Sequence, residues 1–162
     1  MAIDLDQGGR NQQIRPTYLG PSKGWIYTDE PAFIEFVVEG TVSQISAGYK
    51  GGLSIPLYLT INAWAIYADT TGSMVVDVYK LTRDQYLAGT VPSVANTIAG
   101  SALPTVTSNV AARSDTLTGW TTEIKQNDYV AFNVNSCTGI LRASIILECV
   151  KNIGQFSGEG TS

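Results

Sequence analysis

The stretch AIYADTTGSMVVDVYK, residues 65–80, decides the fold class of this chain. β-Branched, aromatic and other apolar residues fill its two ends, and residues 69–72 between them have the composition of a turn. We therefore predict two antiparallel strands joined by a tight turn. One acid, Asp77, stands inside the second strand. Three roles are open to it: a catalytic carboxylate, a metal ligand, or a polar residue on the outward face of a sheet.

Side-chain alternation along the second predicted strand places Asp77. Successive side chains of a strand point to opposite faces, so Asp77 and Tyr79 share the face opposite Val76 and Val78. A glycosidase-type pair with Asp69 is disfavoured, because eight residues of extended chain separate the two acids by over roughly 20 Å, against about 5–9.5 Å in such enzymes. We therefore expect Asp77 to face solvent or an interface.

Short apolar runs with strand composition recur along the chain, and Gly and Pro separate them. Strands are predicted at residues 33–38, 41–46, 57–61, 63–68, 73–79, 122–124, 129–135 and 140–150. One helical turn capped by Thr82 is predicted at residues 82–87, and residues 93–99 are either a second turn or an extended crossing. No amphipathic helix of a dozen residues appears. The sequence thus predicts an all-β fold, an antiparallel β-sandwich of jelly-roll or immunoglobulin-like type.

The ends of the chain differ in composition from this β-rich body. We predict an extended N-terminal arm over residues 1–24, a sandwich domain over residues 25–152 and a short polar C-terminal tail over residues 153–162. Residues 1–24 read either as a disordered tail or as an arm that lies on a neighbouring subunit. On the second interpretation, the candidate partner-binding residues are Ile14, Tyr18, Leu19, Trp25, Trp120 and Phe156.

The three tryptophans have different predicted roles. Trp64 alternates into the sheet and is predicted to lie in the core. Trp25 and Trp120 flank loops, where an aromatic side chain either pins the loop to the body or contacts a partner or a sugar. Pinning is the commoner case.

The charge of the chain argues against several classes of partner. The net charge is −4, the pI is about 4.6 and only 15% of the residues are charged. Binding to nucleic acid is disfavoured because no basic stripe is present to neutralise phosphates, and a membrane surface is disfavoured on the same ground. A weakly charged surface suits a protein that is packed among neighbours.

The residues needed for common catalytic chemistry are missing from the sequence. There is no histidine, which removes the commonest general base and transition-metal ligand. The many Ser and Thr residues have no histidine to activate them as nucleophiles, and the acids are too sparse for a dedicated calcium loop. We expect no enzyme activity, no cofactor and no metal.

Two further features concern redox state and location. Cys137 lies near a predicted turn and Cys149 near the far end of the following strand, so we predict two free thiols instead of a disulfide. The first residues lack a basic start and an apolar run, and no segment approaches the roughly 18 apolar residues of a membrane span. We expect the chain to be made in a cytoplasm and not to be exported by a signal peptide.

Several runs of the β-rich body resemble segments of virion structural proteins of tailed bacteriophages. The runs are WAIYAD (64–69), GSMVVDVYK (72–80), PSVANTIAGS (92–101), PT (104–105), LTGWT (117–121) and DYVAFNV (128–134). The resemblance extends over about residues 57–150. It implies a β-sandwich with a structural or adhesive role, and it carries no catalytic residues.

The resemblance implies a place in the virion, with the major capsid protein or other virion proteins as partners. Because the chain is short and has no repeat or stalk, it suits a capsid decoration (cement) protein better than a complete tail fibre. A homo-oligomer is expected, with a trimer as one candidate. The alternative is a receptor- or glycan-binding module of a tail or head fibre, with an aromatic platform at Trp120 or Tyr86.

Overall fold

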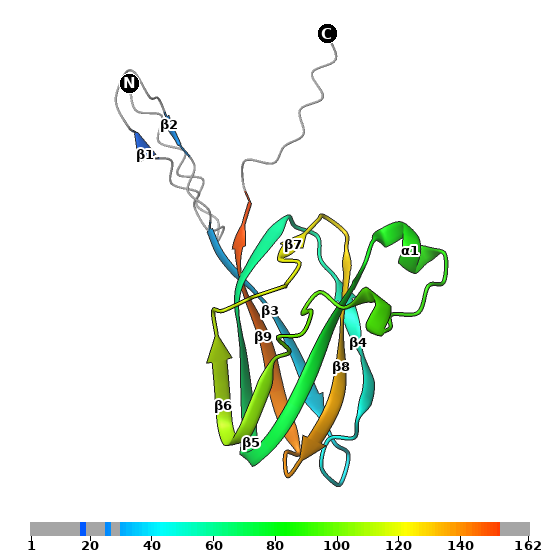
Figure 1. Ribbon diagram of the computed structural model, residues 1–162. Helices are drawn as coiled ribbons and strands as arrows, with labels where there is room; N and C mark the ends of the chain where they lie inside the picture. Colours follow the sequence, from blue (N-terminus) through cyan, green and yellow to red (C-terminus); the bar gives the residue numbers. More distant parts are fainter. Residues whose placement is uncertain (1–16, 19–24, 27–29, 153–162) are drawn as a thin grey trace, which may run out of the picture.

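The computed structural model describes residues 17–18, 25–26 and 30–152, and this part of the chain is almost entirely antiparallel β-structure (Figure 1). The strands are β1 (Thr17–Tyr18), β2 (Trp25–Ile26), β3 (Glu30–Glu39), β4 (Gly48–Ser54), β5 (Leu59–Leu81), β6 (Thr105–Ser114), β7 (Glu123–Ile124), β8 (Tyr129–Thr138) and β9 (Arg142–Lys151). One short helix, α1 (Arg83–Leu87), and one 3₁₀ turn, η1 (Val94–Asn96), lie between β5 and β6. The all-β, antiparallel prediction is confirmed.

Strand β5 organises a curled, seven-stranded sheet. The sheet order is β3-β9-β5-β8-β4, and β6 and β7 also pair with β5. Residues 59–68 of β5 pair with β9, whereas residues 73–81 pair with β8. In Figure 1, β5 folds over at the lower end of the body, where β8 also turns into β9. The sheet therefore bends along a line that crosses these strands.

The predicted hairpin at residues 65–80 is wrong, although both of its strands exist. Residues 64–67 of β5 pair with β6 on one side and β9 on the other, and Met74 and Val75 pair with β6 and β8. Since both edges are occupied at these positions, the two halves of β5 do not pair with each other there. Residues 69–72 form a corner at which β5 exchanges one neighbour for another.

The curled sheet encloses one hydrophobic core. Apolar side chains of the two halves of β5 meet those of β3, β8 and β9 there, and the fully buried ones include Ile66, Met74, Val76, Val78, Phe132, Val134, Ile145 and Leu147. The rings of Phe36 and Phe132 stack with centroids 4.8 Å apart and so join edge strand β3 to β8. Trp64 is buried, as the sequence predicted.

Two strands of the seven-stranded sheet, as well as the short β1 and β2, escaped the sequence prediction, and one predicted strand is wrong. Strand β4 contains Gly48, Gly51 and Gly52, which were read as chain breaks; they accommodate an irregular register between β4 and β8. Strand β6 was also missed, because its side chains do not alternate between buried and exposed. Residues 41–46 form no strand. They are a loop in which Val42 is 95% exposed and only Ile45 enters the core.

Other local predictions are confirmed. Helix α1 begins after Thr82, whose side chain accepts a hydrogen bond from the Gln85 amide, while the Gln85 side chain accepts one from the Thr82 amide. This reciprocal pair is a capping box, which stabilises the first turn of so short a helix. Cys137 and Cys149 are both free thiols. Burial raises the pKa of the Cys149 thiol to about 12, so this side chain stays protonated and unreactive.

The seven-stranded sheet begins at Glu30. Ahead of it, Thr17–Tyr18 pairs with Trp25–Ile26 as a separate two-stranded ribbon. The predicted boundary between residues 24 and 25 therefore divides two strands that pair with each other.

Candidate functional site

Asp77 is buried, with 3% of its surface exposed, so the expectation of a solvent-facing acid is wrong. Its face was assigned correctly, because the residues beside it on the core side are Val76 and Val78. A later segment of the chain covers the outward face. The Asp77 carboxylate accepts a hydrogen bond from the Thr97 hydroxyl at 2.6 Å and one from the Val78 amide at 2.8 Å.

The covering segment is residues 82–97, which we call the excursion. It leaves the end of β5, carries α1 and η1, and stands beside β4 and β8 in Figure 1. It returns to β5 where Thr97 forms a bridge with Tyr79 and where Ile98 donates its amide to the Val78 carbonyl at 2.8 Å. Tyr79 and Ala131 on the outward sheet face are buried. Asp77 thus secures the returning end of the excursion.

Replacing Asp77 by alanine is expected to destabilise the protein by about 1–3 kcal/mol, because the partly buried Thr97 hydroxyl and the buried Val78 amide both lose an acceptor. Urea unfolding followed by tryptophan fluorescence measures this loss. The exposed acid Asp115 is a suitable control, and its alanine variant is expected to change stability by less than about 0.5 kcal/mol. In a double-mutant cycle with Thr97→Val, additive losses would contradict the Asp77–Thr97 contact.

Three tyrosines gather where the excursion meets the sheet. Tyr86 of α1 stacks on Tyr129 of β8, with ring centroids 3.8 Å apart and ring planes inclined by 12°. The hydroxyl of Tyr49, on β4, lies 3.1 Å from the hydroxyl of Tyr129. These side chains come from segments up to 80 residues apart in the sequence. We call them the tyrosine cluster.

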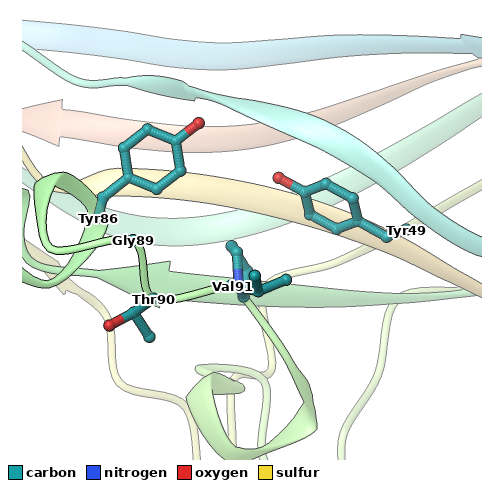
Figure 2. A pocket seen from close by; sticks show the side chains of 6 residues that line it. Tyr49, Tyr86, Gly89, Thr90 and Val91 are labelled. Atoms are coloured by element: carbon teal, nitrogen blue, oxygen red, sulfur yellow. The ribbon is translucent and has the colours of Figure 1, made fainter.

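A cleft of about 430 Å³ opens beside the tyrosine cluster. It is lined by Tyr49, Tyr86, Gly89, Thr90, Val91 and Pro92. Figure 2 shows the rings of Tyr49 and Tyr86 on two sides of this space, with their hydroxyl groups directed toward each other and with Val91 between them. Gly89 has no side chain to fill the cleft, and no lining side chain carries a charge.

The hydroxyl groups of Tyr86 and Tyr129 keep their protons at neutral pH, because the pKa of each is raised. The neighbouring Tyr129 hydroxyl raises the pKa of Tyr86 above its usual value of 10.0. Burial, followed by the hydrogen bond with Tyr49, raises the pKa of Tyr129 in the same way. Each hydroxyl therefore keeps its proton and can both donate and accept a hydrogen bond.

The excursion also presents aliphatic side chains to solvent. Leu87, Val91 and Val94 are exposed by 70%, 74% and 72%, and they lie within eight residues of one another. Single exposed apolar residues are common on protein surfaces, but three on one short segment are a candidate contact area.

A second surface lies on the outward face of β3, β9, β5 and β6. Phe33, Val37 and Tyr67 are exposed there. Arg113 of β6 donates two hydrogen bonds, of 2.8 Å and 2.7 Å, to Glu148 of β9. Strand β5 runs between these two strands. It places Ala65 beside Arg113 and Ala63 beside Glu148, so no large side chain stands between the two ions.

The remaining acids have structural partners. Asp128 is buried in a turn, where it accepts the Lys125 amide at 2.9 Å and lies 3.6 Å from the Lys80 ammonium. Asp69 accepts the amides of Leu141 and Arg142, and these bonds hold its pKa below 3.8. Within the described residues, no three acids or thiols are grouped as metal ligands would be.

Three of the six candidate partner residues, Tyr18, Trp25 and Trp120, are in the described part of the chain. Trp120 is partly buried against the core, and its indole N–H donates to the Ala102 carbonyl at 2.9 Å, so it pins a loop to the body. Tyr18 and Trp25 are register partners in the β1–β2 ribbon. Ile14, Leu19 and Phe156 lie outside the described residues.

Sequence reasoning had named only Tyr86 of the tyrosine cluster. Neither Tyr49 nor Tyr129 stands out in the sequence, because a strand tyrosine on an outward face is ordinary. The signal that could have found them is their position on two strands that pair with each other.

Comparison with known proteins gives no family for this chain. No protein-family model, no curated protein and no solved structure matches it. Among the described residues, no helix has the length and apolarity needed to cross a membrane.

Proposed function

We propose that this chain is a structural protein of a phage virion, a capsid decoration or cement protein. Its partners are the major capsid protein or other virion proteins, and it acts as a homo-oligomer without catalysis or cofactor. The observation that carries the proposal is the group of exposed aliphatic residues Leu87, Val91 and Val94 on one excursion of a weakly charged β-body. A shell-bound protein buries such residues against its neighbours.

The architecture supports this role as a rigid body. Strands β5 and β6 both continue through the corner, and the Phe36–Phe132 stack crosses the core. We infer from this curl a sandwich-like body with two facing halves. Its outward face at Phe33, Val37 and Tyr67 offers a second contact area, while residues 1–24 add an arm.

Deletion of residues 1–24 is expected to leave the unfolding midpoint unchanged, because the seven-stranded sheet begins at Glu30, but to abolish binding to cognate empty capsid shells. Co-sedimentation with shells measures the binding and urea unfolding measures the stability. The full-length chain is expected to sediment in a fixed ratio to shell subunits. Full occupancy by the deletion variant would contradict the role of the arm.

A variant with Leu87, Val91 and Val94 all changed to serine tests the excursion separately. These side chains are exposed in the isolated chain, so the variant is expected to fold normally and to bind shells more weakly. A full-length chain that does not sediment with shells at any ratio would overturn the capsid role.

The second candidate is a receptor- or glycan-binding module of a tail or head fibre. The cleft beside Tyr49 and Tyr86 favours it, since concave sites with aromatic walls and a few polar groups are typical of ligand binding. A stable oligomer that ignores shells and binds a glycan would support this candidate over the first.

A further inference from the structure

We propose that the cleft between Tyr49, Tyr86 and Val91 binds a short, neutral saccharide. The inference rests on the second candidate function and names its site and its ligand class. It does not depend on the capsid role, because the cleft is open in the isolated chain; Val91 belongs to both surfaces, so a shell and a saccharide would compete for it.

The first support is the chemistry of the cleft walls. A pyranose ring has apolar C–H faces and a rim of hydroxyl groups. Val91 and the rings of Tyr49 and Tyr86 supply apolar and aromatic surface, while the tyrosine hydroxyls supply polar groups directed into the same space (Figure 2). Aromatic residues with one apolar face and one polar end are suited to such mixed ligands.

The second support is the protonation of the cluster. Because the phenol of Tyr86 remains protonated, it can donate and accept, as a sugar hydroxyl also does. Tyr129 does not line the cleft, but its hydroxyl lies 3.1 Å from that of Tyr49 and holds this lining residue in place before any ligand arrives. A site that is already ordered loses less entropy on binding.

The third support is the absence of charge in the lining. The lining contains no Asp, Glu, Lys or Arg, so nothing there would offset the desolvation of a sulfate, carboxylate or ammonium group. The ligand is therefore a neutral sugar and not an acidic one. The volume of about 430 Å³ lies toward the lower end of the range for small-ligand sites, which favours a short saccharide.

Proline-rich peptides also bind aromatic grooves, and they are the main rival. Such a peptide is extended by about 3.1 Å per residue and needs aromatic grooves spaced along its length. Here Tyr86 is stacked on Tyr129, and the Tyr49 hydroxyl converges on the same point. Convergent hydroxyls suit a compact polyhydroxylated ring better than an extended chain.

The excursion also explains how the site is built. The capping box at Thr82 and Gln85 fixes the first turn of α1, which carries Tyr86. The returning end is secured by the hydrogen bond between Thr97 and Asp77. The cleft is therefore positioned at both ends by contacts that do not touch the ligand.

The test is a screen of the full-length chain on an array of neutral, sialylated and sulfated glycans, with calorimetric titration of the best neutral hit. The wild-type chain is expected to bind a neutral glycan, and Tyr86→Ala is expected to weaken binding about tenfold or more. Tyr86→Phe is expected to weaken it less, since the ring remains. Tyr67→Ala removes a matched exposed tyrosine from another face and is expected to leave affinity unchanged.

A second measurement covers the case in which Tyr86→Ala disturbs the fold. Titration of the wild-type chain with the same glycan is expected to shift the amide NMR signals of Tyr49, Tyr86 and Val91. No neutral glycan bound at millimolar concentration, shifts confined to another face, or displacement of the glycan by a proline-rich peptide would overturn the assignment. Co-sedimentation of Tyr86→Phe with capsid shells is measured separately from its affinity for the glycan. A loss of one kind of binding without the other therefore shows which of the two proposed functions has failed.

Discussion

Phe132→Ala is expected to lower the free energy of unfolding by about 3–5 kcal/mol, the loss typical of a phenylalanine removed from a close-packed core. Phe132 is fully buried on β8, and in the described part of the chain it is the only aromatic residue among the largest fully buried side chains. Its ring stacks on Phe36 of β3 at 4.8 Å, with the planes inclined by 14°. Truncation would remove both the buried area and the packing between an edge strand and the opposite part of the curl.

Phe33→Ala is the matched control for this prediction. Phe33 lies on β3 close to Phe36, but it points outward and is largely exposed, so its truncation is expected to cost less than about 0.5 kcal/mol. Urea unfolding followed by circular dichroism compares the two variants. A loss below about 1.5 kcal/mol for Phe132→Ala would mean that the curl is not closed over this ring.

The sequence predicted those parts of the fold in which local pattern and final environment agree. A strand was expected at residues 129–135, which lie in β8, and its alternate residues Val130, Phe132 and Val134 are all buried. The helical turn after Thr82 was expected from its cap and has that cap. These features depend on a few neighbouring residues, so the chain itself contains the information.

The prediction failed where a distant segment decides the environment of a residue. Asp77 was assigned to the correct face but to the wrong surroundings, because the excursion returns through Thr97 to cover it. The hairpin at residues 65–80 failed for a related reason. Strand β5 bends at a corner and pairs with β9 before it and with β8 after it. Its local composition is the same as that of two strands joined by a turn, so the sequence does not distinguish the two arrangements.

The tyrosine cluster shows the same limit for the candidate site. Tyr49, Tyr86 and Tyr129 lie on three segments, and their contacts follow from the pairing of β4 with β8 and from the path of the excursion. Sequence alone gave an exposed aromatic at Tyr86. The neighbours that turn it into one wall of a cleft required the tertiary structure.

Gly72→Ala is expected to destabilise the protein by about 3 kcal/mol, which is large for the addition of one methyl group. A Cβ atom at Gly72 would lie 2.4 Å from the Thr138 carbonyl oxygen and 2.6 Å from a side-chain carbon of Ile140. The corner cannot relax freely, because the Asp69 carboxylate accepts the Leu141 amide at 3.2 Å. The methyl group would therefore force apart the two chain segments that turn together.

Gly89→Ala is the control that separates the clash of an added Cβ atom from the backbone strain of replacing a glycine. Gly89 has a φ of +86° and nothing within 4 Å of an added Cβ, so alanine there is expected to cost only about 1 kcal/mol of conformational strain. Equilibrium unfolding in urea compares the two variants. An equal or smaller loss at Gly72 would mean that the corner has room to open and that the bend in β5 is not fixed by its contact with residues 138–140. A loss about 2 kcal/mol larger at Gly72 than at Gly89 would mean that tight packing of this corner sets the curl of the whole sheet.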